Sequence, residues 1–184
     1  MNSLRGHFLV ASPHLPDPNF NRTVVLMVHH DEHGAFGLVL NRPTDATLDE
    51  VWRQVSDTPI ESRQPIFLGG PVPGPLMAIH THAQHADDDV IPGVYLSSQK
   101  EYMETIVEEN LQPFLMFSGY SGWGEGQLEG EMEMGGWLTA PATREAIFTT
   151  ENDELWKRVV SGIGDDILRS AVNIDQFPDD PSLN

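Results

Sequence analysis

The amino-acid sequence predicts an α+β fold within a single domain, and three observations support this prediction. A chain of 184 residues has the length of one domain and can bury a sizeable core. Apolar runs rich in β-branched residues are interleaved irregularly with helices, whereas a doubly wound sheet alternates them regularly. Proline-rich joints at residues 13–18 and 71–75 add to this irregularity. We therefore predict one domain over residues 1–172, followed by an acidic, mobile tail at residues 173–184.

Eight strands are predicted from short apolar runs that are bounded by turn-forming residues. The runs are filled largely by β-branched, aromatic and other apolar side chains, which suit a pleated surface. In chain order they cover residues 8–11, 23–29, 35–40, 65–68, 76–80, 94–96, 114–117 and 137–139.

The two best-marked helices open with capping boxes, in which a hydroxyl accepts an orphan backbone N–H and a glutamate three residues later reaches back. The first box is Thr47–Glu50, and the apolar residues at helical spacing that follow its cap are Leu48, Val51, Trp52 and Val55. The second box is Ser98–Glu101, and the apolar face behind it consists of Tyr102, Met103, Ile106 and Val107.

Three more helical stretches are expected in the C-terminal third of the chain. Residues 127–134 form an amphipathic stretch after a glycine-rich segment. A helix over residues 152–161 has an apolar face made of Leu155, Trp156, Val159 and Val160, and a shorter helix covers residues 165–171.

Acidic residues outnumber basic residues by 28 to 10, which gives a formal net charge of −18. No Lys or Arg lies between Lys100 and Arg144. Nucleic-acid binding depends on Lys and Arg that displace counterions from phosphates, so a surface of this charge repels DNA. We predict no tight binding to duplex DNA at physiological salt in a fluorescence-anisotropy titration. A salt-sensitive, submicromolar complex with nonspecific duplex would contradict this prediction.

The N-terminal residues and the absence of cysteine restrict the compartment and the chemistry. The first apolar run, Phe8–Ala11, is shorter than the roughly 7 to 15 residues of a signal-peptide core. No run approaches the roughly 18 apolar residues of a membrane span. We therefore expect a cytoplasmic protein without a membrane partner. With no cysteine, disulfides, thiolate catalysis and cysteine-ligated metal sites are excluded.

Several motifs carry a resemblance to a known family. They are, in chain order, Gly6–Pro13, Asp17–Phe20, Arg22–Val25, Gly37–Pro43, Leu68–Val72, Phe117–Gly124, Glu125–Glu129 and Gly136–Leu138. In order and spacing these blocks resemble the YqgE/AlgH family of bacterial proteins. The resemblance extends over nearly the whole chain, to about residue 160.

This resemblance implies a soluble bacterial domain with a mixed, branched β-sheet surrounded by helices. It also brings the label of a transcriptional regulator. The predicted helices give that label little support, because they carry mostly acids on their polar faces and none reads as a basic recognition helix. The resemblance supplies no catalytic residues, so none is transferred to this chain.

Histidines form the first candidate site, because all eight precede residue 86. His80 and His82 share one side of a predicted strand, and together with His85 they approximate the His-x-His-x-Asp-His metal signature of metallo-β-lactamase-like hydrolases. Gln84 occupies the position of the aspartate. Solvated loop histidines are therefore the preferred interpretation, and a metal site on His80, His82 and His85 is the alternative. We expect no resident metal and no cofactor.

The glycine-rich segment over residues 119–126 is the second candidate. Its first five residues are Gly119, Tyr120, Ser121, Gly122 and Trp123. They begin like the Gly-x-Ser-x-Gly elbow that exposes a nucleophilic serine, but Trp123 replaces the closing glycine. Every histidine also precedes Ser121, which breaks the hydrolase order of Ser, acid and His. We expect an ordered turn with an architectural role; the alternatives are a ligand- or partner-binding loop and a catalytic Ser121.

Arg22, Asn41 and Arg42 complete the candidate surface for a ligand or partner. Asn41 ends a predicted strand and can cap the turn that follows, while Arg42 is expected to pair with an acid such as Asp17 or Glu131. A structural ion pair is the preferred interpretation. A clamp on a carboxylate or phosphate ligand is the alternative, because the arginine fork suits both anions.

These candidates leave three hypotheses for function. The first is a binding module for a protein or small ligand. The second is a hydrolase-like enzyme that uses residues 119–126 with the histidine cluster as its metal site, and the third is a direct DNA-binding regulator. The enzyme would be favoured by one pocket shared by Arg22, Asn41, Tyr120, Ser121 and a histidine, whereas scattered positions would favour the binding module.

Overall fold

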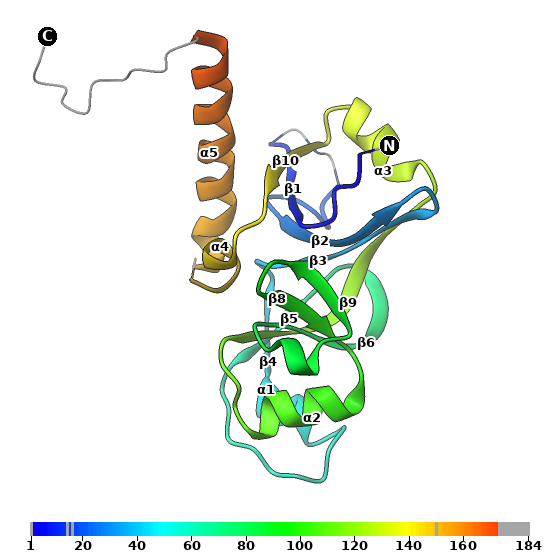
Figure 1. The fold of residues 1–184 in the computed structure, drawn as a ribbon, viewed down its shortest axis with the longest axis vertical. Coiled ribbons are helices and arrows are strands. Elements are labelled where there is room, and N and C mark those ends of the chain that lie inside the picture. Colours follow the sequence, from blue (N-terminus) through cyan, green and yellow to red (C-terminus); the bar gives the residue numbers. More distant parts are fainter. Residues whose placement is uncertain (1, 14, 16, 150, 173–184) are drawn as a thin grey trace, which may run out of the picture.

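The computed structural model describes residues 2–13, 15, 17–149 and 151–172. Within these residues, ten strands form one curled sheet and five α-helices pack around its ends and one side (Figure 1). The strands are almost all antiparallel and the helices do not alternate with them, so the prediction of an α+β fold is confirmed. The predicted tail, residues 173–184, lies outside the described residues.

The elements follow one another in an irregular order. The first half of the chain contains β1 (His7–Ala11), β2 (Val24–Asp31), β3 (Gly34–Val39), β4 (Pro43–Thr47), α1 (Leu48–Trp52), β5 (Pro65–Leu68) and β6 (Val72–His80). After β6 come a short 3₁₀ turn at Ala83–His85, then β7 (Asp88–Ile91), β8 (Val94–Ser97), α2 (Lys100–Glu108), β9 (Phe114–Gly124), α3 (Gln127–Glu133), β10 (Trp137–Pro141), α4 (Arg144–Thr149) and α5 (Asn152–Val172).

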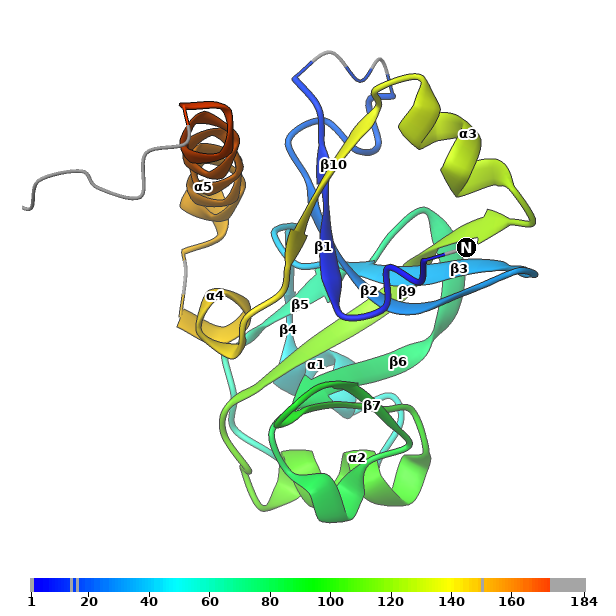
Figure 2. The same cartoon turned by 45° about the horizontal axis from the view of Figure 1, so that its top comes forward.

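Strand β9 connects the two ends of the molecule. The main path of the sheet is β10-β1-β2-β3-β9-β6-β8-β7, with every neighbouring pair antiparallel. Off this path, β5 pairs in parallel with β9 and in antiparallel with β4. Helices α1 and α2 lie at one end of β9, and α3 lies at the other (Figures 1 and 2).

The central strands are buried on both faces. Leu9, Val10, Val25 and Leu26 are inaccessible to solvent, and alternate members of each strand join different apolar clusters. One cluster reaches α4 and α5, and the other reaches α3. A third cluster lies at the far end of β9, where apolar residues of α1 and α2 pack on Met116.

Two strands extend beyond the predicted runs. Strand β6 begins at Val72, inside the predicted proline joint, because its pairing with β9 is irregular between Val72 and Leu76 and tolerates the prolines. Strand β9 continues to Gly124, so the prediction of a turn at residues 119–126 is wrong over most of its length. Small residues there let the neighbouring backbones approach closely, as shown below.

Other differences arise where local signals are weak. Strands β4 and β7 and helix α4 were not predicted; β4 is largely exposed and β7 begins with two aspartates, so neither shows a clear apolar run. The two predicted helices over residues 152–161 and 165–171 form one helix, α5. Among the described residues, no helix is long and apolar enough to cross a lipid bilayer.

Only one of the two predicted capping boxes forms. At α1, the Glu50 carboxylate accepts the backbone N–H of Thr47 at 3.0 Å. Helix α2 has Gln99 as its N-cap residue in place of Ser98. Asp87, which precedes β7, supplies the cap: its carboxylate accepts the backbone N–H groups of Ser98 at 2.6 Å and Gln99 at 3.0 Å.

Candidate functional site

Ser121 lies inside the sheet, and its side chain is fully buried. Its hydroxyl donates a hydrogen bond to the backbone carbonyl of Gly69 at 3.1 Å. On the other side of β9, position 121 pairs with Gly37 of β3. A serine placed in this way cannot reach a substrate without opening of the sheet, and it does not sit on a strand-to-helix elbow.

The glycines near Ser121 have different physical roles. Gly119 has φ of 71°, in the left-handed region that favours glycine. Gly122 is outside that region, and a Cβ there would first meet the flexible ring of Tyr120, 3.1 Å away. Gly69 and Gly70 lie closest to β9: a Cβ at Gly69 would lie 2.3 Å from the carbonyl oxygen of Gly119, and one at Gly70 would lie 2.4 Å from Ser121.

Asn41 holds the chain around it through its side-chain amide. Its Oδ1 accepts the backbone N–H of Val24 at 2.9 Å, and its Nδ2 donates to the carbonyl of Arg22 at 2.9 Å. The predicted pairing of Arg42 with Asp17 or Glu131 is not found; the Arg42 guanidinium donates to the backbone carbonyl of Asn21 instead. Arg42 therefore fixes a loop where an ion pair was expected.

Asn41 brings Arg22 and Arg42 to one region of the fold, and the other residues predicted as a ligand or partner surface make contacts of their own. The Arg22 guanidinium lies over the ring of Trp156, 5.7 Å from its centroid. Tyr120 packs edge-on against Phe36, with 5.5 Å between ring centroids. Neither these residues nor Asn41, Arg42 and the segment 119–123 line the pockets described below. The convergence that would favour an enzyme is absent from these described pockets.

His80 is held in its neutral form by a defined set of hydrogen bonds. Its Nδ1 accepts the backbone N–H of His82 at 3.2 Å, so the ring proton lies on Nε2, which donates to the hydroxyl of Ser97 at 2.8 Å. That hydroxyl in turn donates to the carbonyl of His85. The direction of the hydrogen bond between His80 and Ser97 is therefore opposite to that at an activated serine, where the histidine accepts the hydroxyl proton.

The environment of His80 also opposes protonation. Burial is the largest cause, followed by the nearby His82 and His85, and together they lower the pKa of His80 from 6.5 to about 4. No group of three or more His, Asp or Glu side chains suited to a metal ion is found among the described residues. The candidate ligands His80, His82 and His85 therefore do not form such a cluster.

Asp87 lies near this histidine network and has a structural role of its own. Burial by itself raises the pKa of Asp87, but the hydrogen bonds that its carboxylate accepts from Ser98 and Gln99 outweigh burial and lower the pKa. The ionised carboxylate caps helix α2, where the helix dipole also favours negative charge.

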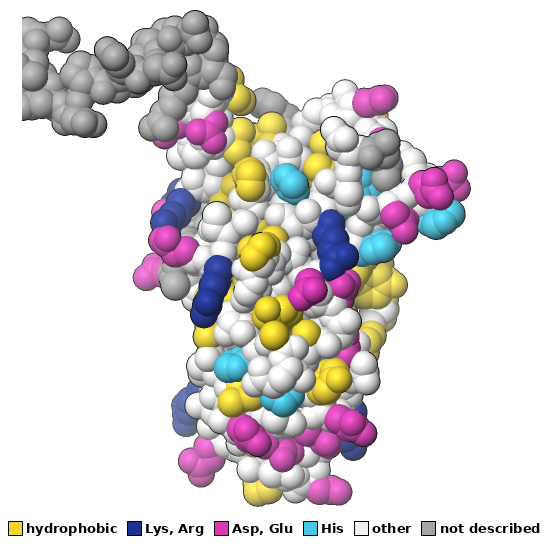
Figure 3. All heavy atoms as spheres, in the orientation of Figure 1, with side chains coloured by type: hydrophobic (Ala, Val, Ile, Leu, Met, Phe, Trp, Pro, Cys, Tyr) yellow, Lys and Arg dark blue, Asp and Glu magenta, His cyan; other side chains and the backbone are white. Residues whose placement is uncertain are grey.

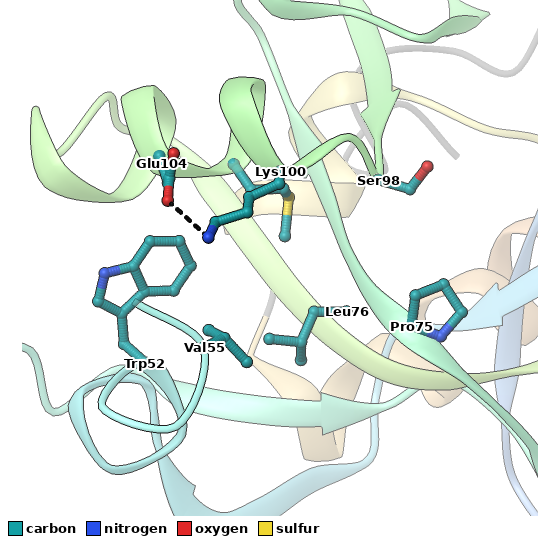
Figure 4. A pocket seen from close by; sticks show the side chains of 8 residues that line it. Trp52, Val55, Pro75, Leu76, Ser98, Lys100 and Glu104 are labelled. Atoms are coloured by element: carbon teal, nitrogen blue, oxygen red, sulfur yellow. Dashed lines mark ion pairs between the residues drawn. The ribbon is translucent and has the colours of Figure 1, made fainter. Parts of the chain in front are cut away.

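A pocket with a volume of about 320 Å³ opens where α1, β6 and α2 meet (Figure 4). Its walls are mainly apolar, and its polar groups come from α2 and the residues just before it. The lining residues are Trp52, Val55, Pro75, Leu76, Ser98, Lys100, Met103 and Glu104. Figure 4 shows Lys100 and Glu104 on one side of this space and Val55 and Leu76 on the other, with the Trp52 ring closing one end.

The charged groups of this pocket form a weak pair. Lys100 Nζ lies 3.5 Å from Glu104 Oε1, and the lysine side chain is 71% exposed. Exposed pairs of this kind contribute little stability, so the ammonium remains available to another anion. Trp52 is almost fully buried; its Nε1 has no hydrogen-bond partner within the described part of the chain, and in Figure 4 it lies on the side of the ring away from Leu76.

The sequence predicted the helices and the strand that line this pocket, but it did not predict that they enclose a pocket. Trp52 and Met103 were assigned to the apolar faces of two predicted helices, and Leu76 to a predicted strand. The sequence pattern that could have indicated the pocket is the presence of two predicted helices, each opened by a capping box and each with apolar residues near its ends. The spacing between their faces depends on how both pack on Met116 of β9, which no local pattern contains.

The fold and these local arrangements can be compared with known proteins. The AlgH-like family matches residues 8–168. The chain belongs to the AlgH-like family. A UPF0301 protein of Xanthomonas campestris is 38% identical over 173 residues, which cover 90% of this chain and 92% of that protein. A UPF0301 protein of Chlorobaculum tepidum is 35% identical over 185 residues, covering 97% of this chain and 95% of that protein.

Two solved structures share the architecture of this AlgH-like protein. The solution structure of the AlgH protein from Pseudomonas aeruginosa matches with a TM-score of 0.77 and 30% sequence identity, covering 96% of this chain and 97% of that one. A crystal structure of a protein from Corynebacterium diphtheriae matches with a TM-score of 0.70 over 86% of each chain. At 24% identity, the second match shows the fold alone.

Proposed function

We propose that this AlgH-like protein is a binding module whose pocket between α1, β6 and α2 takes a small, largely apolar ligand with one negative charge. The single observation that carries the proposal is the pocket itself, which combines apolar walls with one lysine at its edge. Its volume of about 320 Å³ lies within the usual range for sites that bind small molecules.

The apolar part of the ligand is recognised by the walls. Trp52 and Met103 are held by the apolar cluster beneath them, so the floor is already formed before a ligand arrives. Met103 adds a flexible and polarisable surface that adapts to irregular shapes. Removing apolar ligand surface from water supplies the main driving force.

The charged part of the ligand is recognised at the edge. Lys100 supplies an ammonium group that is only weakly paired, and Ser98 lies on the same side of the pocket. Glu104 stays within reach of the same ammonium and repels a second negative charge. A monoanion therefore fits this edge better than a dianion such as a phosphate monoester.

Catalysis by the residues considered for it has little support. The hydrolase hypothesis requires Ser121 to meet a substrate, but its hydroxyl is buried and donates to Gly69. The DNA-binding hypothesis requires a basic face. Figure 3 instead shows acidic side chains gathered at the lower end of the molecule, where α1 and α2 lie.

The proposal is tested with 1-anilinonaphthalene-8-sulfonate, an apolar molecule with one negative charge. We expect saturable binding that shifts the indole N–H resonance of Trp52 and weakens about 10-fold or more in Val55→Trp, which fills the mouth. Leu68→Trp is the matched control, because Val55 and Leu68 are both 46% exposed and only Val55 lines the pocket.

The charge preference has its own pair of variants on helix α2. Lys100→Gln is expected to weaken binding of the sulfonate several-fold, whereas Glu104→Gln leaves it unchanged or tighter, because the lysine loses its competing partner. Equal effects of the two tryptophan substitutions, or of the two glutamine substitutions, would contradict the proposal.

A further inference from the structure

A second pocket lies between Leu15, Asp17 and Phe20, which follow β1, and the turn from α3 to β10. Figures 1 and 2 show α3 and β10 at the end of the molecule opposite α1 and α2. Its volume is about 420 Å³. Its walls combine aromatic and apolar side chains with two carboxylates: Leu15, Asp17, Phe20, Glu131, Met134 and Trp137. This composition differs from that of the first pocket, because no Lys, Arg or His is among the described residues that line it.

The aromatic wall is a packed set of three rings. Phe20 lies edge-on to Trp137, with 5.2 Å between centroids and 71° between planes, and stacks on Trp123 at 6.1 Å. Trp123 and Trp137 are also edge-on to each other at 6.0 Å. Phe20 and Trp137 line the pocket, and Trp123 packs against both of these rings.

Glu131 is positioned by neutral donors. Its Oε2 accepts the indole N–H of Trp123 at 3.0 Å and that of Trp137 at 2.8 Å, and its Oε1 accepts the side-chain amide of Gln127 at 3.0 Å. These bonds orient the carboxylate against the aromatic wall. They do not cancel its charge, because indole and amide groups are uncharged.

Asp17, the second carboxylate of the pocket, also accepts a hydrogen bond from an uncharged donor. Asp17 accepts the backbone N–H of Asn19 at 2.8 Å. Within the described residues, neither Asp17 nor Glu131 lies within ion-pair distance of a Lys, Arg or His. The pocket therefore brings two negative charges to an aromatic surface, and the described part of the chain places no cation beside them.

We propose that this pocket binds an alkylated ammonium group. Carboxylates attract a cation, and the faces of Trp and Phe favour a cation that is weakly hydrated and carries methyl groups. A hard metal ion is a poorer match, because it prefers several oxygen ligands to aromatic carbon. An alkylated ammonium group is present both in small quaternary amines and in the methylated lysine side chains of proteins.

The test compares choline with 3,3-dimethyl-1-butanol, which has the same shape without the positive charge. In NMR titrations at constant ionic strength, we expect choline to shift the indole N–H resonances of Trp123 and Trp137 and to bind at least 10-fold tighter than the neutral alcohol. Trp52 and Trp156 are internal controls. A titration with N-acetyl-trimethyllysine amide shows which of the two sources binds tighter.

Variants then assign the effect to the carboxylates. Asp17→Asn and Glu131→Gln are each expected to weaken choline binding about 5-fold or more, whereas Glu133→Gln, on the same helix and outside the pocket, binds as the parent does. Asp17→Asn keeps the test valid if Glu131→Gln disturbs the tryptophans. The proposal is overturned by equal binding of choline and the alcohol, by no binding of either at millimolar concentration, or by unchanged binding in Asp17→Asn.

Discussion

Alanine in place of Gly70 is expected to lower the free energy of unfolding by about 3 kcal/mol or more, the sum of a steric cost and the loss of a buried hydrogen bond. The new Cβ would lie 2.3 Å from the carbonyl carbon of Tyr120 and 2.4 Å from the nitrogen and Oγ of Ser121. These are mostly backbone atoms of β9, which β3 and β6 hold from both sides, so they cannot move aside as the tip of a side chain could. Displacing Ser121 also breaks its bond to Gly69.

The control for this prediction is Gly124→Ala in the same strand. A Cβ at Gly124 meets no atom within 4 Å, and its φ lies outside the left-handed region. We expect its stability to stay within about 0.5 kcal/mol of the parent. Urea unfolding followed by circular dichroism measures both variants. Equal unfolding midpoints for the two would show that the close approach of Gly70 to β9 does not exist in solution.

Acidification is expected to destabilise the protein through His80. The folded state keeps the pKa of His80 at about 4, chiefly through burial, against 6.5 for a free histidine. Between these values the unfolded chain binds a proton that the folded protein excludes, so stability falls as the pH falls from 6.5 towards 4. At 1.4 kcal/mol per pH unit, and allowing for relaxation of the site, we expect a loss of about 2 kcal/mol by pH 4.5.

Urea unfolding of three proteins between pH 7.5 and 4.5 isolates this contribution. His80→Gln keeps groups able to bond to Ser97 and His82 but cannot titrate, so its stability is expected to decline less over this range. His33→Gln, at an exposed histidine outside this network, is expected to decline as steeply as the parent. Asp87 has a lowered pKa and loses its contribution only when the pH falls below about 3.8, outside this range. Parallel profiles for the parent and His80→Gln would exclude His80 as the cause.

Gly70 and His80, the residues behind these two predictions, both lie in sequence motifs that were first considered for a different role. The Leu68–Val72 and Phe117–Gly124 blocks were recognised as family motifs, and one of them as a variant of a nucleophile elbow. In the fold, these blocks lie against each other, with Gly69 and Gly70 contacting the backbone of residues 119–121. This contact explains Gly69, Gly70 and Gly119.

Local patterns predicted the elements whose stability is itself local. The Thr47–Glu50 capping box and the apolar runs of β1, β2, β3 and β5 were located within one or two residues, because hydrophobic periodicity and turn-forming residues act over a few positions. The same reasoning ended β9 at Phe117. Glycine and serine are poor strand formers on their own, and only the neighbouring strands make their small size an advantage.

Amino-acid sequence alone determined the α+β class, the family, the excess of acidic charge and most of the strands, because each depends on composition or on short-range order. Tertiary structure alone decided which polar residues are buried: Asn41, His80 and Ser121 read as candidates for ligand binding or catalysis until their partners, 17 to 52 positions away, were in place. It also decided where the two pockets lie. A cavity is the space left between surfaces that pack imperfectly. Here those surfaces come from segments distant in the chain: α1 with α2 in one pocket, and Leu15, Asp17 and Phe20 with residues 131–137 in the other.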